Sequence, residues 1–384
     1  YNGYFCGVNA SGAIIDVALA GSDEYDRTWD AVWDVGVAFN ENGWAAEFQF
    51  PFSMFQYENE LNMVWGISFE RMIHRLQETV EWPGKEKSVP VMMLPLGVLK
   101  GLSNIPTANQ LELVPYFLAG VSDGLDADLG IDVRYGLTSK TIMKVTFNPD
   151  FGQVEADPSV LNLTAFETFY EEKRPFFSEG SDFFSQRINL FNSRRIGKRP
   201  NFYIPEEGEI NGLSNYTTIL GATKIMGSTT SNINYGIISA ITKEERATID
   251  DSLSVEKIIV EPRTNYSIGR FEFPIFNTIS KVGFMGTNVI RENAVGANVF
   301  GGDWNLSFLN NRLFSNGQII RSNVNNTIGN AFRFNIGYLN SDWWSARAWF
   351  GTSDDKFDIN DLGFIRRNNI TWSGVRMVLR RQEP

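Results

Sequence analysis

Five acidic residues lie within one short part of the chain, and carboxylates at such spacing can do two kinds of chemistry. Oxygen-rich loops bind hard cations such as Ca²⁺, and two opposed carboxylates can hydrolyse a glycosidic bond. The residues lack the regular spacing of a known calcium loop, so Ca²⁺ is only one alternative, and no catalytic residue is assigned. The favoured interpretation is structural, with carboxylates that pair with arginines or cap helix ends. The five are Asp150, Glu155, Asp157, Glu179 and Asp182.

Basic residues accompany these acids in two groups. Glu172, Lys173 and Arg174 are expected to anchor a loop through salt bridges. A denser run, "SRRIGKRPNFYIP", could bind an acidic glycan or a phosphate group. The alternative is a solvated loop, or a partner for the acids. The basic residues of this run are Arg194, Arg195, Lys198 and Arg199.

Three tryptophans near the N-terminus are candidates for carbohydrate binding. Trp29, Trp33 and Trp44 could form an aromatic platform for sugar rings. Tryptophans on strands are also common in the core of a β-sandwich, which is the structural alternative.

A single histidine and a single cysteine exclude several kinds of site. His74 would have to carry any zinc site or Ser-His-Asp triad alone, and no partner motif lies near it. Cys6 cannot form a disulfide within the chain. Cysteine usage therefore does not reveal the compartment.

Composition narrows the class of protein further. The 384 residues include 34 Lys and Arg against 45 Asp and Glu, a formal net charge of −11. This balance argues against nucleic acid as a partner. Many aromatic residues and glycines are typical of β-sheet proteins with abundant turns. No apolar run approaches the roughly 20 residues of a membrane helix, but strands of a membrane barrel leave a much weaker signal.

Residues 1–98 contain short strand-like runs such as "YFCGVNA", "AVWDVGVAF" and "GWAAEFQFPF". Turn clusters separate them, and "NENG" between two of the runs predicts a hairpin. Short strands at this spacing predict an antiparallel β-sandwich. The periodicity dissolves near residues 95–110, where we place a domain boundary.

From residue 99 onward the pattern predicts a longer-stranded sheet. In "FRFNIGY", Phe332, Phe334, Ile336 and Tyr338 alternate with Arg333, Asn335 and Gly337, and "DLGIDVRYGL" and "WSARAWF" alternate in the same way. Some ten long strands with one apolar face, and no helices to cover it, favour a transmembrane β-barrel with a polar lumen over a soluble sheet. The fold class is therefore all-β, with a partial N-terminal β-sandwich followed by an antiparallel transmembrane β-barrel over 99–384.

Loop lengths suggest an orientation. The connection "TSK" is tight, whereas "GVSDGLDAD" before it is expected to be a longer, acidic connection. Barrels have short periplasmic turns and longer outside loops, which assigns "TSK" to the periplasmic end. If an odd number of strands precedes this turn, the N-terminal domain is expected in the periplasm.

Residues 149–215 interrupt the strand pattern and are predicted to form an inserted plug. Asp157 and Pro158 are a good helix start, and apolar residues recur at helical spacing from Val160 to Tyr170. The helix should end before Pro175. Phe176 and Phe177 are expected to pack the insert inside the barrel, and Gly180 to supply a backbone angle that other residues avoid.

The segment "NPDFGQVEADPSVLNLTAFETFYEEKRPFFSEGSDFF", residues 148–184, resembles the signature of a family of Gram-negative outer-membrane proteins. The family joins a domain like family 9 carbohydrate-binding modules to a C-terminal barrel domain of unassigned function. The resemblance implies an outer-membrane location and glycan contact. Some members carry the label membrane-associated hydrolase. It also implies that the first strands of the module, and further residues beyond "VLRRQEP", belong to a longer mature protein.

Three functions remain open. The favoured one is a non-enzymatic outer-membrane barrel with a periplasmic carbohydrate-binding-like domain, acting in transport or as a subunit of an envelope assembly. Its expected partners are outer-membrane lipid, glycans and other outer-membrane proteins. The alternatives are a membrane-associated glycan hydrolase, which would be a glycoside hydrolase, and a soluble carbohydrate-binding β protein.

Overall fold

A computed structural model describes the chain except for residues 1, 21–23, 27–28, 30, 42, 56, 58–61, 85–95, 104, 106–110, 122–124, 139, 150–169, 171, 204–208, 252–253, 278, 340–342 and 380–384. The chain forms two compact units. One unit is Tyr1–Gln110 with Gly136–Lys140, and the other is Leu111–Tyr135 with Thr141–Pro384.

The first unit is built from small antiparallel sheets. Asn40 pairs with Gly43, which confirms the hairpin predicted from "NENG". Two 3₁₀ turns, η1 (Phe52–Met54) and η2 (His74–Leu76), join strands. The sheets are β1 (Asn2–Val8), β2 (Ile14–Ala20) and β3 (Glu24–Asp26); β4 (Asp34–Asn40) with β5 (Gly43–Gln49); β6 (Met63–Ile67) with β9 (Gly97–Leu102); and β7 (Phe69–Ile73) with β8 (Glu78–Trp82).

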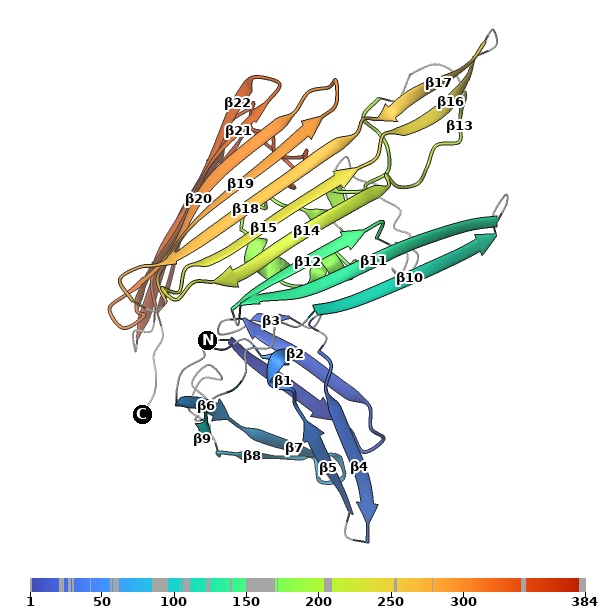
Figure 1. Ribbon diagram of the computed structural model, residues 1–384. Helices are drawn as coiled ribbons and strands as arrows, with labels where there is room; N and C mark the ends of the chain where they lie inside the picture. The colour runs from blue at the N-terminus through green and yellow to red at the C-terminus, as the bar shows by residue number, and fades with distance from the viewer. Residues whose placement is uncertain are drawn as a thin grey trace. The chain divides into compact units, whose positions relative to one another are not determined.

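The second unit contains one twelve-stranded antiparallel sheet, drawn from green to red in Figure 1. The predicted all-β fold is confirmed. The edge strands are β10 and β24, which do not pair with each other in the described residues, so the sheet is open. The strands, in sheet order, are β10 (Leu111–Val121), β11 (Leu125–Thr138), β12 (Thr141–Phe147), β14 (Ile219–Ser228), β15 (Asn234–Thr242), β18 (Thr264–Pro274), β19 (Lys281–Arg291), β20 (Ala297–Phe308), β21 (Leu313–Val324), β22 (Thr327–Tyr338), β23 (Trp344–Ser353) and β24 (Ile370–Leu379).

A smaller sheet extends from this unit. Its strands are β13 (Glu209–Asn211), β16 (Glu245–Asp251) and β17 (Ser254–Glu261). The β16–β17 hairpin lies between β15 and β18 in the chain, and Figure 1 shows it continuing past the ends of these two strands.

One predicted connection is wrong. Residues 120–128 were expected to form a long acidic loop, but β10 runs to Val121 and β11 begins at Leu125, and these two residues pair. Asp126 and Asp128 belong to β11, where they alternate with apolar residues in the sequence. The contrast in loop length that suggested an orientation is therefore much weaker than expected.

The two faces of the large sheet differ. We call the face that residues 172–200 cover the inner face, and the opposite one the outer face. Along β19, Met285 and Val289 are buried on the inner face, while Phe284 and Ile290 are exposed on the outer face. The short helical turns of residues 172–200 lie against one face in Figure 1; they are α1 (Pro175–Ser178), η4 (Ser181–Phe184) and η5 (Ser193–Arg195).

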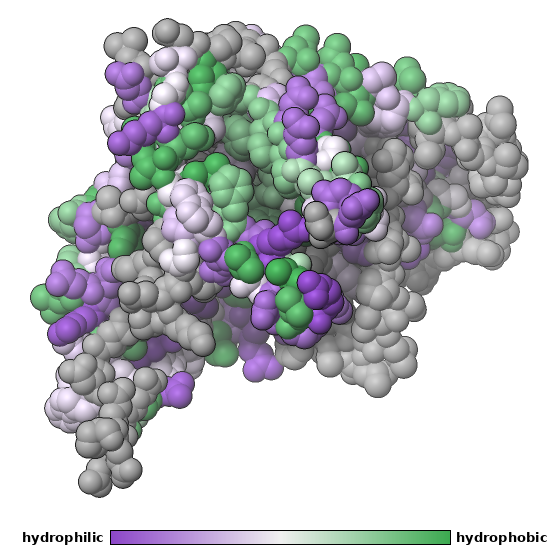
Figure 2. All heavy atoms as spheres, turned by 90° about the horizontal axis from the view of Figure 1, so that it is seen from below, coloured by the Kyte–Doolittle hydropathy of each residue, from purple (hydrophilic) through white to green (hydrophobic). Residues whose placement is uncertain are grey.

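Exposed apolar side chains are numerous, and Figure 2 shows them gathered in several green surface patches. On the outer face, Phe284 stacks on Phe300 of the next strand with ring centroids 6.5 Å apart. No helix of the described chain is both long and apolar enough to cross a membrane.

Candidate functional site: the covered inner face

Residues 172–200 cover the inner face through an apolar core. Phe177, Phe184, Leu190 and Ile196 of this insert are almost fully buried. The inner face was expected to be polar throughout, but beneath the insert it also carries many apolar side chains, which pack against those of the insert. The strands supply Ile219, Ala222, Ile238, Ala240, Tyr266, Ile268, Met285, Val289, Ala297, Val299, Ile320 and Ala331.

Arg174 lies at the centre of the insert, with only 7% of its surface exposed. Its Nε and Nη2 donate to the two oxygens of Glu172 at 2.8 and 2.6 Å. Its Nη1 donates to the Ile196 carbonyl at 2.7 Å, and its Nη2 also donates to the Ser193 carbonyl at 2.6 Å. The guanidinium lies 4.4 Å from the centre of the Phe177 ring. One buried cation therefore joins both ends of the insert.

The pKa of Glu172 reflects two opposing effects. Burial by itself would raise this pKa, but hydrogen bonds and charge from Arg174, with a further hydrogen bond from Ser193, leave it lower than in a free glutamate. Ser193 Oγ donates to the second carboxylate oxygen at 2.6 Å. Glu172 is therefore ionised at neutral pH, as its role as a counter-ion requires. Lys173 donates its backbone N–H to the same carboxylate at 3.0 Å.

Two strand lysines hold the short helix α1 against the sheet. Lys144 of β12 forms an ion pair with Glu179. Lys224 of β14 is buried and donates to the carbonyl oxygens of Glu179, at 2.6 Å, and Phe176. Gly180 follows with a φ of +68°, a left-handed backbone that favours glycine. Arg174 has an extended backbone. The helix predicted to end before Pro175 lies mostly outside the described residues, so its end stays a prediction.

A second buried ion pair fixes the middle of the insert. Arg270 of β18 donates both terminal nitrogens to Asp303 of β20, at 2.8 and 3.2 Å. Gln186 of the insert donates to the same carboxylate at 2.5 Å. Gln318 of β21 accepts from the Ile188 N–H at 2.8 Å and donates to its carbonyl at 3.3 Å. Side chains from β18, β20 and β21 thus contact both the backbone and the side chains of the insert.

A segment between β23 and β24, residues 354–368, also folds onto the inner face. Its Phe364 N–H donates to the Asn189 carbonyl of the insert at 2.9 Å. Arg291 of β19 forms an ion pair with Asp361 of this segment. Its buried apolar side chains are Phe357, Ile359 and Leu362.

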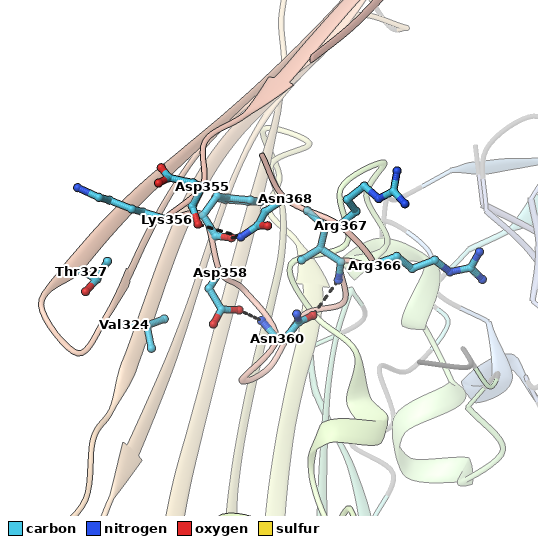
Figure 3. Close-up of a pocket in the computed structure, with 11 residues that line it drawn as sticks. Val324, Thr327, Asp355, Lys356, Asp358, Asn360, Arg366, Arg367 and Asn368 are labelled. Carbon is cyan, nitrogen blue, oxygen red and sulfur yellow. Dashed lines mark hydrogen bonds between the residues drawn. The ribbon is translucent and has the colours of Figure 1, made fainter. Parts of the chain in front are cut away.

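A hollow of about 490 Å³ borders this segment. Figure 3 shows Asp355 and Lys356 on one side of it, whereas Arg366 and Arg367 extend to the other side. The Asn360 N–H donates to the Asp358 carboxylate at 2.9 Å within the loop. Because acidic and basic side chains both line this hollow, its charge does not indicate one class of ligand.

The predicted carboxylates have separate positions. Asp150, Glu155, Asp157 and Pro158 lie outside the described residues, with most of the helix expected after them. Glu172 and Glu179 each have a basic partner, and Asp182 lies in the exposed first turn of η4. Within the described part of the chain, no group of three or more His, Cys, Asp or Glu side chains could hold a metal ion. The Ca²⁺ alternative stays a prediction.

The predicted basic run does not act as one patch. Arg194 Nε lies 3.9 Å from Glu172 Oε1, and Arg195 donates to the Gly363 carbonyl at 3.2 Å. Lys198 donates to the Asn201 side chain at 2.6 Å, and Arg199 is exposed. The first two residues stabilise the insert and its contact with residues 354–368.

The three tryptophans of the first unit differ in burial. Trp29 and Trp33 are 7% and 6% exposed and form a core with Met54, which favours their structural interpretation. The Trp33 indole donates to Asp16 at 3.1 Å. Trp44 is half-buried, and the Arg71 guanidinium lies 4.8 Å from its ring centre. Sugar binding by these residues stays a prediction.

A further group of inner-face residues was not predicted as a site, because the sequence shows only that polar and apolar residues alternate along these strands. The polar faces of β22 and β23 carry Arg333, Arg347 and Trp349, and strand pairing brings them beside Trp372 and Arg376 of β24. A run of arginines on the polar faces of successive strands was the available signal. Only the register of the strands shows that these residues are neighbours.

These features define a class: an all-β protein with a large two-sided antiparallel sheet whose inner face is covered by its own inserted segment. The chain belongs to the family described as "Domain of unknown function (DUF5916)", whose model matches residues 107–384. No curated protein matches the chain.

Among solved structures, the chain is similar to in-vitro folded OmpT, an outer membrane protein of Vibrio cholerae. The identity is 9%, the match covers 69% of this chain and 94% of that chain, and the TM-score is 0.28. The trimer form of OmpT is similar at 9% identity over 70% and 97% of the two chains, with a TM-score of 0.27. Likeness at this level does not extend to function.

Proposed function

We propose that the protein is an outer-membrane β-barrel protein whose interior is occupied by residues 172–200. It acts in transport across that membrane or as a subunit of an envelope assembly, and the first unit serves as a periplasmic carbohydrate-binding-like domain. The observation that carries the proposal is the two-sidedness of the large sheet. Its outer face exposes large apolar side chains from neighbouring strands, including Phe271, Phe284 and Phe300. Such a continuous apolar band suits hydrocarbon, and in water it would cause aggregation.

The inner face supports the plug part of the proposal. Buried Lys224 donates to a carbonyl oxygen of the insert and buried Arg270 lies beside its Phe183 ring, so charge as well as apolar packing holds the insert to the inner face. The partners of Glu172 and Glu179 favour a structural role for these carboxylates. This interpretation is preferred to the glycan-hydrolase alternative, which needs an open carboxylate pair.

The experiment that tests the plug is a leakage measurement. The double variant Phe176→Ala, Phe177→Ala removes two buried rings and leaves cavities, which should loosen the insert. When the purified protein is reconstituted in liposomes, this variant should release a small trapped dye faster than the wild type. The matched control is Phe284→Ala, Phe300→Ala, which removes two rings from the outer face and should leave the leakage rate unchanged.

Folding of both variants is checked by the heat-dependent mobility shift of barrels on detergent gels. Equal leakage from the wild type and a folded Phe176→Ala, Phe177→Ala variant would contradict the plug. Failure of the wild type to enter liposomes would contradict the membrane location.

A further inference from the structure

Nine inner-face positions on β22, β23 and β24 form three consecutive register rows, which we call the arginine–tryptophan array. Gln318 contacts the insert and pairs with Arg333, so the array lies on the same face as the insert. Directly paired side chains have Cβ atoms about 5 Å apart, and successive rows on one face lie about 7 Å apart. The rows are Arg333–Gly351–Trp372, Asn335–Trp349–Gly374 and Gly337–Arg347–Arg376.

Glycines in the array give two tryptophan rings room to lie flat. A Cβ atom added at Gly351 would collide with the Trp372 ring, and one added at Gly374 would collide with the Trp349 ring. Each ring therefore lies across the backbone of the neighbouring strand. Both rings and three arginines line a hollow of about 540 Å³. Flat aromatic rings beside a hollow can stack on the faces of sugar rings.

The charge of the array is uncompensated within the described part of the chain. Arg347 and Arg376 stand directly opposite each other, an arrangement that destabilises a sheet. Arg333 lies within electrostatic range of Arg347 and of Arg187 from the insert. These four arginines form no ion pair with a described carboxylate, whereas Arg270 and Arg291 on the inner face each do.

Contacts orient one of these arginines toward the hollow. Arg347 Nε donates to the Asn335 side chain at 2.8 Å, and its guanidinium lies 5.9 Å from the centre of the Phe314 ring. These contacts leave the terminal nitrogens of Arg347 available to an oxyanion, and arginine binds such groups with two parallel hydrogen bonds.

We propose that the arginine–tryptophan array binds an acidic oligosaccharide, with its carboxylate or sulfate groups on Arg333, Arg347 and Arg376 and its sugar rings on Trp349 and Trp372. The inference rests on the proposed function, because a solute reaches the array only if the inner face lines an aqueous interior. It adds the substrate class that this interior accepts. A simple inorganic anion would use the arginines without needing the tryptophans.

Isothermal titration of the full chain in detergent micelles tests the inference. The probes are tetragalacturonate, a heparin-derived sulfated tetrasaccharide, neutral maltotetraose and inorganic pyrophosphate. At least one acidic oligosaccharide should bind, and the better of the two identifies the oxyanion. Maltotetraose should not bind, and pyrophosphate should bind more weakly than the acidic sugar.

Two variants assign this binding to the array. Arg347→Gln and Trp349→Ala should each weaken it about tenfold or more, since each removes a direct contact. Arg321→Gln is the matched control, because Arg321 is an exposed arginine on the outer face of β21 and pairs with Phe300. This variant should bind like the wild type.

Arg376→Glu separates binding from folding. The new carboxylate faces Arg347, so the thermal midpoint of the variant should rise while acidic-sugar binding is lost. The inference is overturned if neither acidic oligosaccharide binds, if binding survives Arg347→Gln, or if pyrophosphate binds as well as the sugars and Trp349→Ala has no effect. Micelle binding does not depend on the plug, so loss of this inference leaves the leakage result standing.

Discussion

The buried ion pair between Glu172 and Arg174 holds the two ends of the insert together. Both side chains are 9% exposed, and the arginine binds carbonyl oxygens from the far end of the insert. Removing one member of a buried pair leaves the other charge uncompensated. The stability of the insert therefore depends on the ionised state of one carboxylate.

Glu172→Gln should destabilise the insert by about 3–5 kcal/mol, the usual cost of breaking a buried pair. Because folding lowers the pKa of Glu172, its contribution is complete above the pKa of an unfolded glutamate and is lost as pH falls through the lower folded pKa. The wild type should thus lose protease resistance in residues 172–200 as pH falls below the usual glutamate range. Glu172→Gln should be sensitive already at neutral pH and change less with pH.

Glu292→Gln is the control for this prediction, since Glu292 is exposed and follows β19. It should keep the wild-type pH profile. Equal protease resistance of Glu172→Gln and the wild type at neutral pH would show that the pair does not hold the insert.

Strands and hairpins could be predicted from the sequence where a local pattern, such as alternation or a turn motif, is sufficient to define them. Alternation of Phe332 and Phe334 with Arg333 marks β22, and "NENG" marks the β4–β5 hairpin. The alternation of apolar and polar residues also continues through Leu125–Leu129 and would have placed these residues in β11. Their acidic composition led instead to the wrong prediction of a loop. Local spacing also indicated that Glu172 and Arg174 lie close together.

Register could not be predicted from one sequence, and the candidate sites depend on it. Arg333, Trp349 and Arg376 are neighbours only because β22, β23 and β24 pair in one particular alignment. The apolar part of the inner face was missed for a related reason. A strand pattern shows which residues share a face, but it does not show which segment will cover that face.

The position of residues 354–368 depends on a close contact between their backbone and Gly329 of β22. A Cβ atom added at Gly329 of β22 would collide with the backbone of Lys356 and Phe357, which cannot move aside as a flexible side chain can. Gly329→Ala should therefore displace this segment and cost about 1–3 kcal/mol, as overpacking does. Hydrogen exchange should show faster exchange of the amides of residues 354–368.

Gly269→Ala in β18 is the matched control, since an added Cβ there meets no atom within 4 Å. Its exchange pattern should equal that of the wild type. Unchanged protection of residues 354–368 in Gly329→Ala would mean that the segment is held mainly by its other contacts, such as Arg291 with Asp361.

At the scale of the whole molecule, the proposed membrane location makes a prediction that depends on depth. Phe284 lies three residues inside β19 on the outer face, whereas Ile290 lies on the same face one residue from the end of the strand. An arginine facing lipid costs about 2–4 kcal/mol at the bilayer midplane and about 0–1 kcal/mol near the interface. Phe284→Arg should therefore reduce the folded fraction in phospholipid vesicles, measured by the heat-dependent gel shift, far more than Ile290→Arg.

The same pair of variants separates lipid from water as the surroundings of the outer face. If that face meets water, Phe284→Arg removes an exposed apolar ring and should improve solubility without detergent, with no loss of folded protein. If it meets hydrocarbon, the charge opposes insertion, and the unfolded fraction of Phe284→Arg should increase while inner-face contacts such as Arg270 with Asp303 stay intact in the molecules that do fold. Equal folded fractions for the two variants would contradict a membrane-spanning sheet.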